Sequence, residues 1–310
     1  MNPPRREGGR PARRRLDGVL LLDKPLGLSS NQALQAVRRL YAAEKAGHAG
    51  TLDPLATGLL PLCFGEATKF SGELLNADKR YVATVQLGVT TDTADAEGAV
   101  LQRRPVGFGR AAVESMLAAF VGQIDQVPPM YSALKRDGRP LYQYARAGIE
   151  VERPPRRVLI HELRLQGVDE GLAGGRFAVE VRCSKGTYVR TLAADIGERL
   201  GCGAHLAALR RTAIGGLGVA QAHSLAVLEG LAGEAARDAL LLPPDSLLSS
   251  LGEVRLDAAD AARIRRGQAV RWSGEEGRRL RVYDAEGGFI GVCRQLADGW
   301  LQPLRLVAGA

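Results

Sequence analysis

The stretch AGHAGTLDPLATGLLPLCFGEATKF, residues 46–70, joins an irregular glycine-rich segment to a run of apolar residues. Gly50 and Gly58 allow sharp turns and a close approach to a ligand, because glycine carries no Cβ. Pro54 pushes the residue before it, Asp53, toward an extended backbone and out of a helix. A carboxylate held in this way can serve as a nucleophile or base. On the residues alone, Asp53 can equally cap the turn by bonding its own backbone.

Strand and helix patterns follow one another around this stretch without a regular βαβ alternation. Alternating or continuous apolar runs predict strands over 18–25, 79–88, 156–168 and 175–186. Apolar residues at helical spacing predict helices over 29–41, 66–76, 109–122 and 187–201. We therefore expect an α+β domain whose sheet is mixed, mainly antiparallel, and flanked by helices.

Three changes of composition predict how the chain is divided. Residues 1–17 hold six arginines among Pro and Gly, which predicts a basic flexible tail. The Pro- and Ser-rich connection at 241–254 predicts a boundary between a domain at 18–245 and a small β-barrel at 252–310. Residues 128–151 interrupt the periodic pattern with prolines, tyrosines and a basic turn, and we interpret them as a long surface excursion.

Charge and cysteine content narrow the class of protein. The 310 residues include 42 Lys and Arg against 34 Asp and Glu, a formal charge of +8, which favours a polyanionic partner. The alternative is a GC-rich organism that favours Arg over Lys. The four cysteines lie far apart, so we expect no metal site, no disulfide framework, and a reducing, cytoplasmic compartment. No apolar run reaches the roughly 18 residues of a membrane span. The acids of TDTADAEG, 91–98, do not have the spacing of a calcium loop.

Five ordered blocks of the sequence resemble the TruB family of pseudouridine synthases. They are GVLLLDKPLGLSSN (18–31), GHAGTLDPLATGLLPLCFGEATKF (47–70), DKRYVATVQLGVTTDTADAEG (78–98), PPMYSALKRDGRPLYQYARAGIEV (128–151) and CSKGTYVRTLAADIGERLGCGAHLAALRR (183–211). The resemblance implies a pseudouridine synthase catalytic domain that isomerises uridine 55 in the T loop of transfer RNA. The segment from about 252 resembles, more loosely, the PUA-type RNA-binding domain often appended to this family.

The resemblance also implies roles for the residues of the site. Asp53 is the family's nucleophile or its equivalent, and Arg190 is the cation beside it. Tyr81 stacks on the flipped uracil and takes part in moving the proton from C5, while Tyr188 and Leu209 line the pocket. Without the family, Tyr81 reads as a core strand tyrosine, Arg190 as an exposed helix arginine and Leu209 as an ordinary helix leucine.

Further family positions surround the expected pocket. His48 is expected to insert into the T loop, and Lys24 with Pro25 to support the active site. The segment 128–151 is expected to close on the RNA, and its basic side chains to contact phosphates. These side chains are Lys135, Arg136, Arg139 and Arg146.

The expected function is that of a cofactor-free isomerase acting on the T arm of transfer RNA, with no obligatory protein partner. Two alternatives come from other classes. A transfer-RNA folding chaperone would use the same pocket to unfold and refold the T arm, and this role can coexist with catalysis. A nucleoside glycosidase would use the aspartate to hydrolyse free nucleosides with water as the acceptor.

Overall fold

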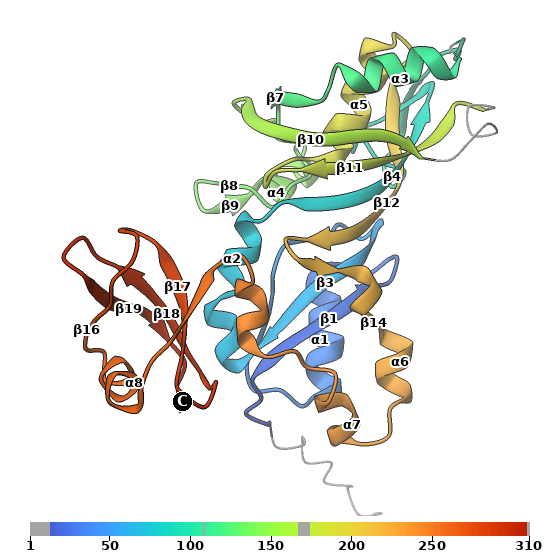
Figure 1. Cartoon of the computed structure of the whole chain (residues 1–310). Coiled ribbons are helices and arrows are strands. Elements are labelled where there is room, and N and C mark those ends of the chain that lie inside the picture. Colours follow the sequence, from blue (N-terminus) through green and yellow to red (C-terminus); the bar gives the residue numbers. More distant parts are fainter. Residues whose placement is uncertain (1–12, 108, 167–173, 309–310) are drawn as a thin grey trace, which may run out of the picture.

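A large mixed sheet lies at the centre of the computed structural model, which describes residues 13–107, 109–166 and 174–308 (Figure 1). In spatial order its main strands are β14 (His223–Ser224), β1 (Gly18–Lys24), β3 (Ala56–Phe64), β12 (Ala204–Ile214), β4 (Lys79–Leu87), β11 (Arg176–Cys183), β10 (Arg156–Gln166) and β7 (Gly122–Gln126). Strands β2 (Ala46–His48) and β13 (Leu217–Gly218) pair with β3 and β12. The pairs β1–β14 and β3–β12 are parallel and the others antiparallel, so the predicted α+β fold with a mixed, mainly antiparallel sheet is confirmed.

Helices flank this sheet, and two small hairpins project from it. The helices are α1 (Ser30–Leu40), η1 (Gly65–Lys69), α2 (Ser71–Asn76), α3 (Arg110–Ala118), α4 (Leu141–Arg146), α5 (Val189–Arg199), η2 (Val219–Gln221), α6 (Leu225–Gly230), α7 (Glu234–Asp238) and η3 (Pro244–Leu248). The hairpins are β5 (Val89–Thr91) with β6 (Val100–Arg103), and β8 (Lys135–Arg136) with β9 (Arg139–Pro140). The excursion 128–151 thus contains the β8–β9 hairpin and α4. The single helix predicted over 66–76 is wrong, because the chain forms η1 and α2 with a break at Phe70.

Two apolar clusters on the sheet meet at the centre of the domain. One packs α3 and α5 against β4, β10, β11 and β12, and the other packs α1 and α6 against β1 and β3. A capping box at Ser29 starts α1, and Gly201, at φ +80°, follows the end of α5. Tyr81 and Leu209 contact both clusters. A site at these two residues therefore lies between the two helix-covered parts of the sheet.

The C-terminal part forms a second, five-stranded sheet with its own core. Its order is β15 (Gly252–Arg255), β17 (Arg279–Tyr283), β18 (Phe289–Gln295), β19 (Trp300–Leu306) and β16 (Val270–Arg271), and α8 (Ala258–Arg265) packs with it. The series has β15 and β16 at its two ends and makes a half-barrel, consistent with the small PUA-like β-barrel expected from the sequence. All five strands lie within 252–310, the segment for which the sequence predicted this small domain.

Polar and apolar contacts hold the half-barrel against the large domain. Arg279 forms a two-pronged ion pair with Glu73 of α2, at 2.6 and 2.8 Å. The ring of Phe289 lies edge-on to that of Phe70, with centroids 5.5 Å apart. Leu248, in the connection 241–254, is fully buried in a cluster that includes residues of both parts. The predicted boundary therefore carries part of the shared core.

The described end of the predicted tail, residues 13–17, is not entirely free, because Arg14 is bound to the folded domain. Arg14 accepts from the backbone of Glu44 and donates to that of Ala42, and its guanidinium pairs with Glu234 and Asp238 of α7. Two carboxylates of the folded domain thus anchor a residue that the composition placed in a flexible segment. Residues 1–12 lie outside the described residues.

At Gly58 the backbone of β3 comes so close to that of the paired strand β12 that no side chain fits between them. Its φ is +97°, and an added Cβ would lie 2.3 Å from the backbone oxygen of Arg211 on the paired strand β12. We expect Gly58→Ala to lower the free energy of unfolding by about 3 kcal/mol or more, because strain and overlap with backbone add together. Denaturant unfolding measures the loss. Gly27→Ala is the matched control, since Gly27 has φ +83° but nothing within 4 Å of an added Cβ. Equal losses of unfolding free energy in the two variants would contradict the role of this close approach between the strands.

Candidate active site

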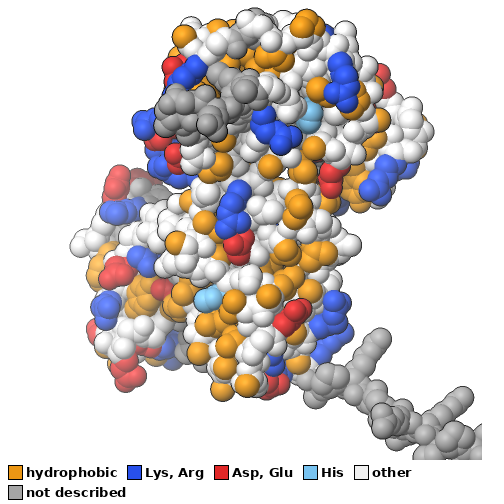
Figure 2. Space-filling model, turned by 90° about the vertical axis from the view of Figure 1, so that its right-hand side faces the viewer, with side chains coloured by type: hydrophobic (Ala, Val, Ile, Leu, Met, Phe, Trp, Pro, Cys, Tyr) orange, Lys and Arg blue, Asp and Glu red, His pale blue; other side chains and the backbone are white. Residues whose placement is uncertain are grey.

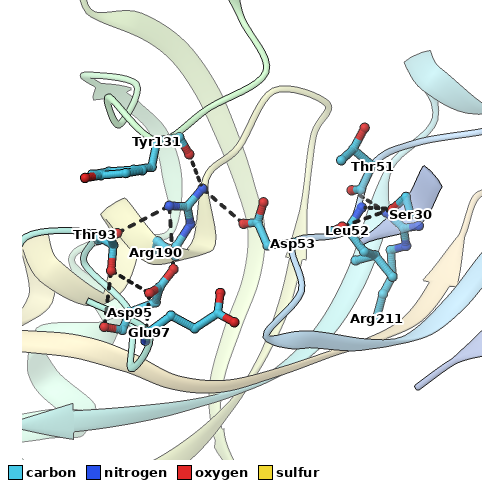
Figure 3. A network of polar contacts seen from close by, with 10 residues as sticks. All are labelled: Ser30, Thr51, Leu52, Asp53, Thr93, Asp95, Glu97, Tyr131, Arg190 and Arg211. Carbon is cyan, nitrogen blue, oxygen red and sulfur yellow. Dashed lines mark hydrogen bonds and ion pairs between the residues drawn. The ribbon is translucent and has the colours of Figure 1, made fainter. Parts of the chain in front are cut away.

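Asp53 lies in the loop between β2 and β3, and buried groups hold this loop in place. Gly50 has φ +87°, a value that an L residue rarely adopts, and it allows the turn. From α1, Ser30 Oγ donates to the carbonyl of Leu52 at 3.0 Å and accepts from its N–H at 2.7 Å (Figure 3). The Asp53 carbonyl accepts from the N–H of Ala56, which closes the turn. The backbone on each side of the carboxylate is therefore fixed.

Arg190, in the first turn of α5, forms an ion pair with Asp53. Its Nη2 lies 3.0 Å from Asp53 Oδ2, and its side chain is only 6% exposed. Arg190 is therefore not an exposed helix arginine. Asp53 itself keeps 42% of its side chain open to the adjoining space, so one carboxylate can meet both the cation and a bound substrate.

A second carboxylate and two carbonyls complete the contacts of Arg190. Asp95 Oδ2 lies 3.6 Å from Nη1, and its side chain is 5% exposed. Nη1 also donates to the carbonyl of Thr93 at 3.3 Å, and Nη2 donates to that of Tyr131 at 2.7 Å. Figure 3 shows these groups converging on one guanidinium from three segments of the chain. These contacts fix the orientation of the Arg190 guanidinium.

Burial sets the protonation behaviour of the site. It raises the pKa of Asp53, the Arg190 guanidinium opposes that rise, and the neighbouring Asp95 adds to it. Burial, with Asp95 and Asp53 nearby, also raises the pKa of Glu97. Three carboxylates, those of Asp53, Asp95 and Glu97, therefore lie near the charge of Arg190. Of these, Asp53 lines the adjoining cavity.

A cavity of about 590 Å³ opens in front of this ion pair. Its lining brings together five residues that the sequence predicted: Asp53, Tyr81, Tyr188, Arg190 and Leu209. The interpretation of Leu209 as a helix residue is wrong, because it lies on β12 and pairs with Ala83 of β4. Ser132 and Leu134, from the segment 128–151, also line the cavity. The cavity thus has an acidic end, an apolar wall and two phenols.

Three other predicted residues lie outside the lining of the cavity. Lys24, at the end of β1, is fully buried and donates to the carbonyls of Pro25 and Leu28. Burial lowers the pKa of Lys24 to about 8, while Asp53 and Glu97 favour its charged form. His48 lies on β2 with its Nδ1 buried and unpaired, and burial lowers its pKa. Lys24 ends β1 and Pro25 follows it, and His48 ends β2, just before the Asp53 loop.

The four basic residues of the segment 128–151 are exposed and do not reach the cavity. Arg139 stacks over the ring of Tyr144 at 4.8 Å, and Arg146 lies over Tyr142 at 5.6 Å. Arg136 donates to the carbonyl of Glu152 at 2.6 Å. These contacts orient the cations on the outer side of a segment whose inner side lines the cavity.

The sequence did not single out several residues that hold this site. Asp95 belongs to the acidic run 91–98, which was rejected as a calcium loop and lies in one of the five family blocks, but was given no role in the site. Ser30 and Arg211 are adjacent to the Asp53 loop in space and distant from it in sequence. Among the described residues, no cluster of three or more His, Cys, Asp or Glu could hold a metal ion. No described helix is long and apolar enough to cross a membrane.

Comparison with known proteins shows to which family the chain belongs. Residues 38–189 match the model for the N-terminal domain of the TruB family pseudouridylate synthases, 190–249 that for the tRNA pseudouridylate synthase B C-terminal domain, and 252–307 that for the C-terminal part of pseudouridine synthase II TruB. The tRNA pseudouridine synthase B of Burkholderia mallei is 60% identical over 305 residues, 96% of each chain. The chain belongs to the TruB family. The protein of the same name from Thiobacillus denitrificans is 56% identical and covers 96% of this chain and 98% of its own.

Solved structures share the TruB fold at low sequence identity. An H/ACA RNP bound to a substrate RNA containing 2′-deoxyuridine has a TM-score of 0.70 at 21% identity, covering 93% of this chain and 84% of its own. A Cbf5-Nop10-Gar1 complex has a TM-score of 0.69 at 24% identity, with coverage of 90% and 78%. The pseudouridine synthase fold is confirmed. The TruB segments 38–189 and 190–249 meet at the cavity, since the first supplies Asp53 and the second Arg190.

Proposed function

We propose that this protein isomerises uridine 55 in the T loop of transfer RNA to pseudouridine. The observation that carries the proposal is the half-open Asp53 carboxylate, paired with buried Arg190 at the end of a cavity lined by Tyr81 and Leu209. The TruB family membership and the tRNA pseudouridine synthase B relatives support it. The position within transfer RNA rests on the family resemblance.

The reaction breaks the N1–C1′ glycosidic bond and forms a C5–C1′ bond in the same nucleotide. Atoms and electrons are conserved, so the isomerisation requires no redox co-substrate. The target base must leave its stack to enter the cavity, at a cost of a few kcal/mol. Stacking on an aromatic ring is worth roughly 1–3 kcal/mol per base, and the presence of Tyr81 in the lining of the cavity supports this role for its ring. Asp53 assists cleavage as a nucleophile or as a base.

A purified-enzyme assay tests the proposal directly. The protein is incubated with T-arm RNA, and pseudouridine is mapped by position. We expect modification at position 55 and none in an RNA with cytidine there. Free uridine serves as a second substrate, because release of uracil from it would favour the nucleoside glycosidase. Modification at another position would overturn the assignment of the site, while leaving the reaction class intact.

Binding of the RNA is proposed to depend on the segment 128–151 together with the half-barrel. Figure 2 shows a face on which Lys and Arg side chains are scattered among hydrophobic ones, so no single basic band marks an RNA path there. The four exposed cations of 128–151 are, by contrast, close in sequence and adjoin the cavity wall made by Ser132 and Leu134. Phosphate contacts at this segment would hold the flipped nucleotide's neighbours.

We expect the salt dependence of RNA binding to report these contacts. Neutralising all four cations to Gln should lower the log–log slope of affinity against salt by about 0.7–0.9 for each phosphate that is no longer neutralised. The substituted residues are Lys135, Arg136, Arg139 and Arg146. The measurement is a titration of T-arm RNA at several salt concentrations. The control is Arg39→Gln with Lys45→Gln, two exposed cations on and just after α1. An equal slope in both variants would place the RNA elsewhere.

A folding role for the protein is a separate, compatible proposal. The exposed cations of 128–151 lie apart from the Asp53 carboxylate, so grip on the RNA and chemistry use different groups. If the chaperone role exists, Asp53→Asn should still accelerate annealing of unfolded transfer RNA. An annealing assay with this variant distinguishes the two roles.

A further inference from the structure

Arg211, on β12, is a buried cation for which catalysis as outlined above assigns no task. It is 1% exposed, and its Nε donates to the carbonyl of Leu59 at 2.8 Å. Its Nη1 and Nη2 reach the carbonyls of Thr51 and Gly50, each at 3.3 Å. In Figure 3 it lies beneath the part of the loop that precedes Asp53. One guanidinium thus holds the strand β3 and the catalytic loop in register.

The two buried arginines of the site differ in their charge balance. Arg190 has two carboxylate partners, Asp53 and Asp95. Within the described residues, no ion pair joins Arg211 to a carboxylate. A buried cation without an anion is costly, and carbonyl oxygens satisfy its donors without cancelling its charge. Arg211 therefore leaves a net positive charge within the site.

The side chain that receives this charge is Tyr81. Arg211 and Tyr81 are directly paired across the antiparallel strands β12 and β4, and each favours the charged form of the other. The other groups that act on the phenol are Cys183 from β11 and Asp53 from the loop. Burial raises the pKa of Tyr81, and Arg211 is the strongest influence opposing that rise.

Other cations also surround Arg211. Lys24, His48 and Lys79 each have a pKa lowered in part by its charge. Lys79 donates to the carbonyls at the end of α2, and Lys24 donates to those after β1. Neither is hydrogen-bonded to Tyr81. Of these four cations, only Arg211 is paired directly with Tyr81, across β12 and β4.

We propose that Arg211 is a positioning residue with two tasks, to fix the loop that carries Asp53 and to stabilise the phenolate of Tyr81. The proposal rests on the proposed function, because in that reaction C5 of the uracil releases the proton that the phenolate of Tyr81 accepts. After C5 has bonded to C1′, the C5 proton passes to the Tyr81 oxygen. The C–H electron pair forms the C5–C6 double bond, the pair of the N1–C6 double bond returns to N1, and N1 takes up a proton. Arg211 stays charged throughout.

The test separates charge from support by comparing Arg211→Gln with Arg211→Lys. Gln keeps a donor for the loop carbonyls and loses the charge, whereas Lys keeps the charge. Single-turnover conversion of T-arm RNA is measured against pH. For Gln we expect the more alkaline rising limb of the profile, which reflects ionisation of Tyr81 and not of Asp53, to move to higher pH by about one to two units, so that raising the pH restores part of the rate. Lys should lower the rate at every pH without moving the limb.

Arg210→Gln is the matched control, because Arg210 is the next residue and its guanidinium pairs with Asp23 on β1. Its profile should overlie that of the wild type. Equal losses in the Gln and Lys variants with unmoved limbs would reduce Arg211 to a structural support and overturn the proposal. A wild-type protein that forms no pseudouridine at any pH would instead overturn the proposed function.

A second measurement needs no Arg211 variant. The ultraviolet titration of the wild type minus that of Tyr81→Phe isolates the ionisation of Tyr81, and Tyr41→Phe isolates Tyr41 in the same way. Burial raises the pKa of Tyr41 to about 12, and Tyr41 donates to the carbonyl of Arg237. We expect Tyr81 to ionise at a lower pH than Tyr41. Ionisation of Tyr81 at the same pH as Tyr41 or above it would overturn the proposal even if Arg211→Gln did not fold.

Discussion

Asp53→Asn should abolish pseudouridine formation while leaving the affinity for transfer RNA nearly unchanged. The amide keeps the shape of the carboxylate and loses its charge, so it can neither attack carbon nor accept a proton as a base. Loss of a sole nucleophile lowers the rate by about four orders of magnitude or more. The cations proposed to grip the RNA are elsewhere, on the exposed side of 128–151, so the dissociation constant should stay within about tenfold.

Single-turnover conversion and a binding titration on T-arm RNA measure the two quantities. Asp23→Asn is the control, because Asp23 is also ion-paired to an arginine, Arg210 at 2.7 Å, but does not line the cavity. Its rate should stay within about threefold of the wild type, as for most substitutions away from the reacting groups. Near-normal turnover by purified Asp53→Asn protein would refute the role of Asp53.

The pH dependence of the wild type should show the environment of this carboxylate. Burial raises the pKa of Asp53 above the ordinary value of 3.8, and Arg190 limits that rise. Only the ionised form can act, so the rate falls as the pH drops through the raised pKa. The acid limb assigned to Asp53 should therefore lie at a higher pH than that of an exposed aspartate, and should move higher still in Arg190→Met.

Much of the fold follows from local periodicity. Strands β1, β4, β10 and β11 and helices α1, α3 and α5 lie within the ranges predicted for them, because each carries its apolar residues at one regular spacing. The pattern fails in β12, where the register shifts between Leu206 and Ala208 and again between Arg211 and Ala213. Such shifts break the alternation of faces, so HLAALRR reads as a helix.

The residues that hold the Asp53 loop could not be predicted from local sequence patterns, for a different reason. Arg211 contacts the carbonyl of Thr51 across 160 positions of the sequence, and Ser30 clamps Leu52 across 22. These contacts depend on the parallel pairing of β3 with β12 and on the packing of α1, which no spacing within one segment encodes. Asp53 could be found because its motif is local, whereas the groups that orient it arrive from distant elements.

Replacing Arg190 should have the second largest effect. In Arg190→Met, the buried Asp95 and the half-open Asp53 lose the cation that they share. Breaking a buried ion pair by removing one partner typically costs about 3–5 kcal/mol, and part of that cost appears as a further rise in the pKa of Asp53. At neutral pH less of the carboxylate is then ionised, and its orientation toward the cavity is lost. We expect single-turnover conversion to fall by two or more orders of magnitude.

Arg190→Lys should restore only part of this loss, because of how the guanidinium is used. Arg190 meets Asp53, Asp95 and the carbonyls of Thr93 and Tyr131 with two nitrogens in one plane. A lysine ammonium supplies the charge from a single point and cannot make all four contacts. Conversion should therefore lie between that of the wild type and that of Arg190→Met, and the acid limb of Arg190→Met should move to higher pH than that of Arg190→Lys. Arg104→Lys is the control, since Arg104 pairs with Glu198 of the same helix at 3.2 Å and does not line the cavity. If both Arg190 variants ran within about threefold of the wild type, the ion pair would be structural, and the ionisation of Asp53 would have to depend on Lys24, the other cation that favours it.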